Sequence, residues 1–310
     1  MHFMPHSDTT PILIAGATAS GKSALALALA KQLNGVIINA DSMQVYGTLR
    51  VLTARPDAAD EAEAPHKLYG HIAPGAPYNV GQWQSEALAE IKAAQAAGQV
   101  PIVVGGTGLY FASLTDGLNA IPDIDETVRQ GLRRRLVDEG VEALHAELQQ
   151  KDPPLAARLP TTDSQRIVRG LEVEASTGQK LSDWQKMETT PPLSDSRNIL
   201  LMPERQWLYE RCNRRFEMMV QGAARAEVER LWAYNLPPET PAMKALGVAE
   251  ILAMLQGEMS EADAMAAAQQ ATRRYAKRQM TWFRNRMSDW KSFSEQDYEN
   301  NFDKIFSFIA

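Results

Sequence analysis

A glycine-rich turn between an apolar run and an alanine-rich segment constrains this chain more than any other stretch. Residues 12–15 are apolar and Gly16 follows. After four intervening residues, Gly21, Lys22 and Ser23 open a segment rich in alanine and leucine. This is the complete G-x-x-x-x-G-K-[ST] pattern, with a strand before it and a helix after it. The glycines let backbone N–H groups point inward, and the first helical turn adds unpaired donors. The pattern predicts a loop that binds a diphosphate or triphosphate, with Lys22 as a cation and the Ser23 hydroxyl as a ligand for Mg²⁺.

Further apolar runs predict an α/β fold with a P-loop-type parallel sheet core and flanking helices. The runs at 35–40, 100–104 and 198–203 are short and almost wholly apolar, as strands buried on both faces are. Helical patterns occupy 21–33, 80–97, 205–233, 242–256 and 261–286. Between residues 119 and 194 short helical patterns follow one another without a strand run. We predict a catalytic core from residues 1–118 and 195–287, an inserted helical domain at 119–194 and a C-terminal tail at 288–310.

Two of the predicted strands end in residues that can carry chemistry. Asp41 follows the run at 35–40, and Thr107 follows the run at 100–104. The carboxyl ends of parallel strands carry the ligand site, so both residues should reach the edge that holds the phosphate loop. Asp41 is a candidate general base or metal ligand, while a helix cap is the structural alternative for both residues. P-loop hydrolases carry a metal-binding Asp at such a strand end, so Thr107 favours an enzyme whose loop holds a phosphorylated substrate.

The charge pattern indicates a polyanionic partner. The 310-residue chain has a net charge of −6, yet basic residues cluster at 129–135, 211–215 and 273–286. In the last cluster the i,i+4 pair Arg274 and Arg278 places like charges side by side, which is unfavourable unless an anion lies across them. Aromatic residues are interleaved there, which suits phosphate contact combined with base stacking. A solvated basic face is the alternative.

The remaining composition is ordinary. No apolar run approaches the length that spans a bilayer, and a lone cysteine, Cys212, excludes an intrachain disulfide. We expect a cytoplasmic monomer that does not bind membranes.

Five motifs, in this order, resemble those of the tRNA dimethylallyltransferases, also called tRNA isopentenyltransferases. They are GATASGKS at 16–23, DSMQVY at 41–46, GGTGLY at 105–110, DSQR at 163–166 and RYAKRQ at 274–279. The family moves a dimethylallyl group from dimethylallyl diphosphate to the exocyclic N6 of the adenine just 3′ of the anticodon. The chain departs from the family at 51–55, where glycine and lysine are frequent, and at 248–249, where a basic or aromatic residue is usual.

The resemblance implies roles for individual residues. Asp41 would take the N6 proton and Thr107 would hydrogen-bond near the reacting amine, which makes these two the catalytic residues. The implied diphosphate-binding residues are Gly16, Ala17, Thr18, Ala19, Ser20, Gly21, Lys22, Ser23 and Arg215. Ser23 would also bind the Mg²⁺ cofactor. The implied tRNA-binding residues are Asp41, Ser42, Met43, Gln44, Thr107, Arg129, Gln165, Arg166, Ile167, Val168, Arg169, Lys244, Gly247, Arg274, Lys277, Arg278, Trp282 and Arg284.

Two other functions stay open at this point. A small-molecule kinase would use the loop for ATP and Asp41 as a base, but it leaves the basic last helix without a role. An RNA-binding module with a vestigial loop would need no catalytic residues. We predict the prenyltransferase, with tRNA and dimethylallyl diphosphate as substrates.

Overall fold

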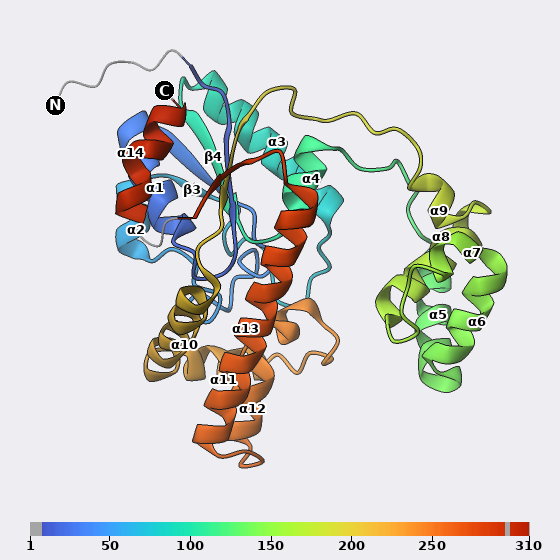
Figure 1. The fold of residues 1–310 in the computed structure, drawn as a ribbon. Coiled ribbons are helices and arrows are strands. Elements are labelled where there is room, and N and C mark those ends of the chain that lie inside the picture. The colour runs from blue at the N-terminus through green and yellow to red at the C-terminus, as the bar shows by residue number, and fades with distance from the viewer. Residues whose placement is uncertain (1–7, 295–297, 310) are drawn as a thin grey trace. The chain divides into compact units, whose positions relative to one another are not determined.

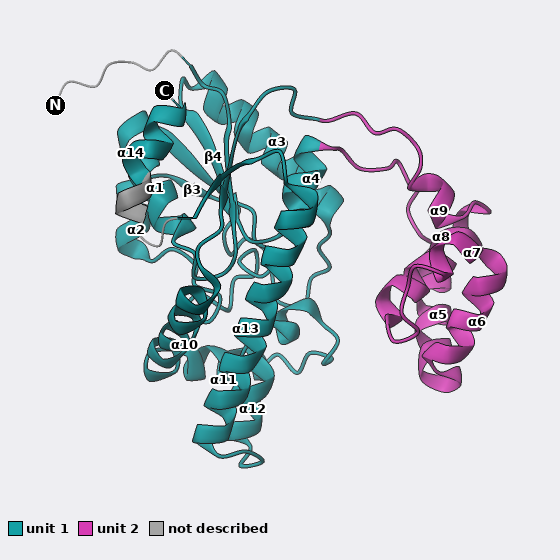
Figure 2. Ribbon diagram, in the orientation of Figure 1, with its two compact units in different colours: residues 1–115, 192–310 teal, residues 116–191 magenta. Residues whose placement is uncertain are grey.

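The computed structural model describes residues 8–294 and 298–309, with the backbone alone at 298–301. It consists of two compact units (Figure 2). One unit comprises residues 1–115 and 192–310, and the other is Asp116–Pro191. The second unit is helical and lies close to the limits 119–194 expected from the sequence. None of the described helices combines the length and the hydropathy needed to cross a membrane.

A six-stranded parallel sheet forms the centre of the first unit (Figure 1). Its strands are β1 (Ile12–Gly16), β2 (Gly35–Asn39), β3 (His66–Lys67), β4 (Val100–Gly105), β5 (Arg197–Leu201) and β6 (Lys291–Phe293). The order across the sheet is β3-β2-β4-β1-β5-β6. Ala15 pairs with Gly105 and Asn39 with Val104, so β1, β2 and β4 end together at one edge. The predicted parallel α/β core is confirmed.

Side chains of β1 alternate between two cores, because successive residues of a strand point to opposite faces. Ile12 and Ile14 belong to the core beneath α1 (Lys22–Leu33) and α14 (Tyr298–Ile309). Leu13 and Ala15 belong to the core on the other face, which Trp83, Phe111 and Phe283 also fill. Those three aromatic residues come from α3 (Val80–Ala96), α4 (Gly108–Thr115) and α13 (Glu261–Arg286). Helices on both faces explain why β1, β2 and β4 read as continuous apolar runs.

A third core lies beyond the sheet edge. It joins residues 45–52 to α10 (Arg205–Gln221), α11 (Ala224–Trp232), the 3₁₀ helix Pro241–Lys244 and α12 (Val248–Leu255). The helical pattern at 205–233 divides into α10 and α11 at Gly222, whose ψ of −137° is not helical. The short α2 (Ala58–Glu63) completes this unit. The buried carboxylate of Glu227 accepts the backbone N–H groups of Arg50, Val51 and Leu52, which anchors the loop after β2 to α11.

The second unit packs five helices around its own apolar core. They are α5 (Glu126–Glu139), α6 (Val141–Lys151), α7 (Pro153–Ala156), α8 (Ser164–Thr177) and α9 (Leu181–Trp184). Leu144, Leu148 and Ile167 are fully buried at its centre. Asp152 is buried as well, and its carboxylate accepts the N–H groups of Leu155 and Ser182, which ties α7 to α9.

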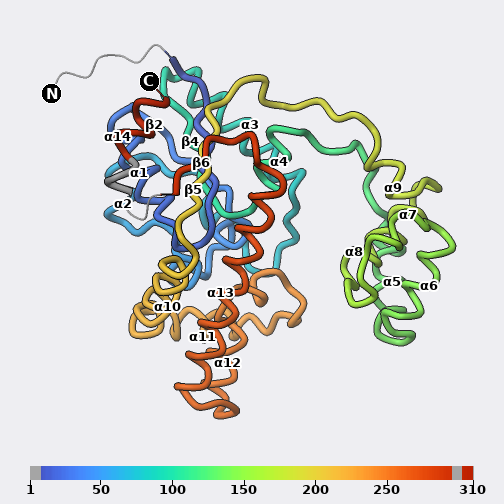
Figure 3. Tube along the Cα trace, viewed as in Figure 1, coloured from blue at the N-terminus to red at the C-terminus, as the bar shows by residue number. Residues whose placement is uncertain are grey.

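The C-terminal residues differ from the expected tail. Strand β6 pairs with β5 at the edge of the sheet (Figure 3). Ile305 and Ile309 of α14 are buried against the core under α1. The described part of this segment therefore adds the edge strand β6 to the sheet and the helix α14 to the core under α1.

Candidate active site

The phosphate loop has the geometry its sequence predicts. Gly21 has a φ of +93° and Ala19 a φ of +64°, so the chain turns through left-handed conformations before α1 begins at Lys22. A side chain at Gly16 would lie 2.7 Å from the Ser20 hydroxyl, so glycine is needed there. The Lys22 Nζ donates to the carbonyl of Ala17 at 3.2 Å. This hydrogen bond joins the end of the loop to its beginning.

Helix α10 contributes three side chains to this loop. The Arg215 guanidinium donates to the Thr18 hydroxyl, and the Arg211 Nε donates to the carbonyl of Ala19 at 3.1 Å. The Cys212 Sγ lies 3.9 Å from the Thr18 carbonyl. Arg215 thus reaches the loop from a position almost two hundred residues away in the sequence.

Lys22 and Arg215 lie at the loop in a partly buried site. Burial lowers the pKa of Lys22 to about 8; Asp41 raises it in part, and the charge of Arg215 lowers it. Burial also lowers the pKa of Arg215. Holding two like charges together in a partly buried site is unfavourable unless an anion joins them. Together with the start of α1 at Lys22, this favours a polyphosphate ligand.

Asp41 is held by its neighbours in an orientation that leaves one oxygen free. The Asn39 Oδ1 accepts the Asp41 N–H at 2.9 Å, and the Asn39 amide donates to the Asp41 carbonyl at 3.0 Å. The Asp41 Oδ1 accepts the Met43 N–H at 2.9 Å. None of the described groups hydrogen-bonds to the Asp41 Oδ2. One oxygen therefore fixes the side chain while the other can accept a proton.

The structure brings Thr107 next to Asp41. The Thr107 Oγ1 accepts the Ser42 N–H at 2.9 Å and donates to the Ser42 hydroxyl at 3.3 Å. The Thr107 N–H donates to the carbonyl of Ala40 at 3.1 Å. The turns after β2 and β4 are thus joined by three hydrogen bonds.

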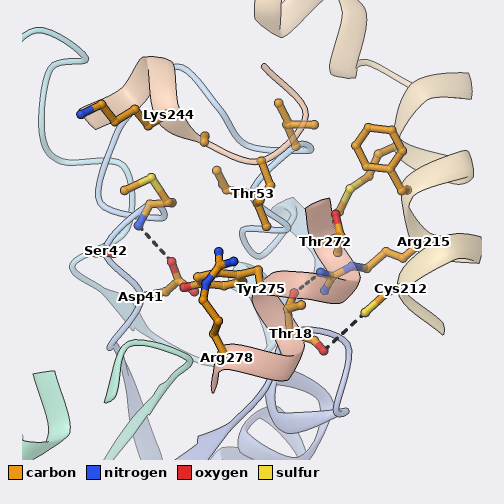
Figure 4. A pocket seen from close by; sticks show the side chains of 16 residues that line it. Thr18, Asp41, Ser42, Thr53, Cys212, Arg215, Lys244, Thr272, Tyr275 and Arg278 are labelled. Carbon is orange, nitrogen blue, oxygen red and sulfur yellow. Dashed lines mark hydrogen bonds between the residues drawn. The ribbon is translucent and has the colours of Figure 1, made fainter. Parts of the chain in front are cut away.

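A cavity of about 250 Å³ connects these parts (Figure 4). Its polar lining includes Thr18, Asp41, Ser42 and Arg215, and Figure 4 shows Asp41 and Arg215 on opposite sides of it. Its other lining residues are Met43, Leu52, Thr53, Cys212, Phe216, Met219, Lys244, Ala245, Leu246, Thr272, Tyr275 and Arg278. A carboxylate, a phosphate-binding loop and an apolar wall thus face one space.

The exposed face of α13 carries the predicted RNA contacts of this unit. Arg274, Lys277, Arg278 and Arg284 are exposed. None of these four forms an ion pair with a carboxylate that the structure describes. Arg278 lies 5.5 Å from the Tyr275 ring centroid. This face offers uncompensated positive charge next to the cavity.

Three other predicted contacts have structural roles, and a fourth, Lys244, is exposed. Trp282 is half-buried against Gly108, where a Cβ would lie 2.2 Å from its ring. Gly247 has a φ of +89°, and a Cβ there would lie 2.6 Å from the ring of Phe216. The Gln44 amide donates to the carbonyls of Thr53 and Ala54, which fixes the loop that lines the cavity. Lys244 is exposed beside the cavity.

The predicted RNA contacts at 129 and 165–169 belong to the second unit. Arg129 pairs with Glu126 at 3.1 Å, Arg166 with Asp163 at 3.3 Å, and Arg169 with Glu172 at 3.7 Å. Gln165 is exposed. The side chains of Ile167 and Val168 are buried in the core of this unit.

Gln279 is a site residue that the sequence reasoning missed. It lies on α13, is only 6% exposed, and accepts the Thr18 N–H at 2.9 Å. Its amide Nε2 donates to the Gly106 carbonyl at 2.8 Å. The helical spacing could have indicated this residue, because position 279 falls on the buried stripe of α13 with Thr272, Ala276 and Phe283. A polar amide on such a stripe requires buried partners.

The donors present fit Mg²⁺ held largely by a substrate. The described residues contain no group of three or more His, Cys, Asp or Glu side chains that could hold a metal. Mg²⁺ often keeps several waters and binds through substrate phosphates plus one or two protein oxygens. The exposed Ser23 hydroxyl, at the start of α1, is such an oxygen.

Comparison with known proteins agrees with this geometry. The IPP transferase family model matches residues 44–286, and the isopentenyl transferase model matches residues 10–69. The tRNA dimethylallyltransferases of Rhizobium etli and Azorhizobium caulinodans are each 54% identical to this chain over 281 residues. These alignments cover 90% of this chain and 94% and 90% of the two relatives.

Solved structures show the same likeness. The full-length tRNA isopentenylpyrophosphate transferase of Bacillus halodurans aligns with a TM-score of 0.70 and 32% identity, over 97% of this chain and 96% of its own. A eukaryotic dimethylallyltransferase, solved acting on tRNA, aligns with a TM-score of 0.77 and 25% identity, over 95% of this chain and 76% of its own. The resemblance seen in the five motifs is confirmed, and the chain belongs to the tRNA dimethylallyltransferase family.

Proposed function

We propose that this protein transfers a dimethylallyl group from dimethylallyl diphosphate to N6 of the adenine that follows the anticodon of tRNA. The observation that carries the proposal is the shared cavity, which Asp41 lines together with Thr18 and Arg215 of the diphosphate site. The family membership and the names of the relatives support the same reaction.

We assign to the phosphate loop the binding of the leaving group, which is the diphosphate. As the bond between C1 of the allyl group and the bridging oxygen breaks, its electron pair stays with the diphosphate, whose negative charge grows. Lys22, Arg215 and the loop N–H groups that have no partner among the described residues would stabilise that charge. Mg²⁺, held by Ser23 and the diphosphate, would add positive charge at the leaving group.

Asp41 acts at the other end of the reaction. The adenine N6 is a poor nucleophile because its lone pair is delocalised into the ring. As the new C–N bond forms, N6 must lose a proton, and the free Asp41 Oδ2 accepts it. Thr107 lies beside Asp41, and Ser42 orients its hydroxyl. We assign to this hydroxyl a hydrogen bond close to the reacting amine.

The RNA must bring a single base into the cavity. An adenine stacked in the anticodon loop cannot reach Asp41, so the base is flipped out of the stack. The exposed row of Arg274, Lys277 and Arg278 binds the RNA backbone. We assign additional RNA contacts to Lys244, Arg129 and Gln165. The protein works as a monomer in the cytoplasm.

One experiment tests the proposal against its alternatives. The protein and Mg²⁺ are incubated with unmodified tRNA and either labelled dimethylallyl diphosphate or terminally labelled ATP. We expect label from the allyl donor in the RNA and none from ATP, and no transfer to the same tRNA with guanine in place of the target adenine. Label transferred from ATP would support a kinase, and RNA binding without any transfer would support a binding module.

A further inference from the structure

We propose that Gln279 is a positioning residue that sets the distance between the diphosphate site and the base. None of the described hydrogen bonds joins it to the Asp41 carboxylate. Its amide instead bridges the two turns that carry those parts of the site. The inference rests on the proposed transfer reaction.

The bridge uses both ends of one buried amide. The Thr18 N–H donates to the Gln279 Oε1 at 2.9 Å, and the Gln279 Nε2 donates to the Gly106 carbonyl at 2.8 Å. The orientation is unambiguous, because a backbone N–H can only donate and a backbone carbonyl can only accept. Gln279 thereby joins residues that lie 261 and 173 positions away in the sequence.

Each turn that Gln279 touches leads directly to a part of the site. Thr18 lines the cavity and accepts a hydrogen bond from Arg215, so its position sets one end of the diphosphate site. Gly106 precedes Thr107, whose hydroxyl accepts the Ser42 N–H next to Asp41. A Cβ at Gly106 would lie 2.4 Å from the Gln279 Nε2, so the two residues fit together only because position 106 has no side chain.

The pairing of β1 with β4 ends at Ala15 and Gly105. Beyond that pair, the Gln279 side chain is the link between the Thr18 turn and the Gly106 turn among the hydrogen bonds that the structure describes. A shift of about 1 Å between reacting groups can cost about a hundredfold in rate. Gln279 should therefore affect the transfer step much more than tRNA binding, which uses the opposite, exposed edge of α13.

Single-turnover transfer and tRNA affinity, measured on Gln279→Met and Gln279→Glu, separate these effects. Methionine keeps the length of glutamine and removes both hydrogen bonds. We expect Gln279→Met to slow transfer by about tenfold or more while the Kd for tRNA stays within about twofold. Gln269→Met is the matched control, because Gln269 lies on the same helix and bonds to Asn213 and Glu217, away from both turns.

Gln279→Glu adds a readout that loss of packing alone would not move. An ionised glutamate can accept the Thr18 N–H but repels the Gly106 carbonyl, whereas a protonated glutamate can donate to it. The transfer rate of Gln279→Glu relative to wild type should therefore rise as the pH falls, and that of Gln279→Met should not. A Gln279→Met rate within about twofold of wild type, a loss confined to tRNA affinity, or a pH-independent ratio for Gln279→Glu would each overturn the inference. Absence of transfer by the wild-type protein would instead overturn the proposed function.

Discussion

Lys22 should destabilise the protein as long as no anion is bound beside it. Burial lowers the pKa of its amine from 10.5 to about 8. At 1.36 kcal/mol for each pKa unit, this difference corresponds to about 3 kcal/mol against the charged amine. Solvent reaches part of the side chain and screens it, so the real penalty is smaller. We expect Lys22→Met to raise the free energy of unfolding by roughly 1–2 kcal/mol near neutral pH while removing diphosphate binding.

The pH dependence of this effect has a definite sign. Below about pH 8 the amine is charged in both the folded and the unfolded protein, so the whole penalty is present. As the pH rises from about 8 towards 10.5, the folded protein loses this proton before the unfolded protein does, and the penalty disappears. The advantage of Lys22→Met should therefore be largest near neutral pH and should shrink in alkaline solution.

Urea unfolding with and without inorganic diphosphate measures both effects. Diphosphate at about a hundred times its Kd should stabilise the wild-type protein by about 2.7 kcal/mol and leave Lys22→Met unchanged. Lys31→Met is the matched control on the same helix, because Lys31 is exposed and pairs with Glu63, and it should stay within about 0.5 kcal/mol of wild type. The reasoning is refuted if ligand-free Lys22→Met is less stable than wild type near neutral pH, or if its advantage does not shrink in alkaline solution.

Three further changes test other parts of the structure. Asp41→Asn can keep the hydrogen bond from Met43 but cannot accept the proton. Single-turnover transfer should therefore fall by about a hundredfold, which corresponds to about 2.7 kcal/mol in activation free energy. A fall of less than about threefold would exclude Asp41 as the base. Arg274→Ala combined with Arg278→Ala should weaken tRNA binding and flatten its salt dependence, whereas an unchanged slope would indicate a solvated face. Ile305→Ala should lower the free energy of unfolding by about 2–4 kcal/mol in urea titrations, because this side chain is fully buried under α1, and a loss below about 1 kcal/mol would contradict that packing.

The parts of the fold that the sequence predicts are those written in local patterns. Strands β1, β2 and β4 are buried on both faces, so each appears as an unbroken apolar run. The phosphate loop has fixed spacing, and parallel strands bring Asp41 and Thr107 to one edge without further information. The contact between Arg215 and Thr18 could not be predicted from a local pattern, since only the tertiary structure brings this residue of α10 to Thr18.

The C-terminal segment shows where local patterns are weaker than tertiary contacts. Strand β6 has three residues, of which Phe293 alone is apolar and buried, so its pairing with β5 leaves almost no trace in the sequence. Helix α14 does leave one, because Phe302, Ile305, Phe306 and Ile309 recur at helical spacing and pack against one core.

Gly105, the last residue of β4, and Gly106, which follows it, explain why this strand end lacks the Asp found in P-loop hydrolases. A side chain at Gly105 would meet the Ala40 carbonyl at 2.0 Å, and one at Gly106 would meet the Gln279 Nε2 at 2.4 Å. The metal-binding Asp that P-loop hydrolases place at a strand end would therefore collide with backbone at position 105, and at position 106 it would displace the Gln279 amide. A Cβ at Gly106 would also lie 3.5 Å from the Asp41 Oδ2, so an aspartate there would set two carboxylates against each other and favour protonation of one. Without a side chain at position 106, Asp41 is the carboxylate that faces the cavity at this strand edge.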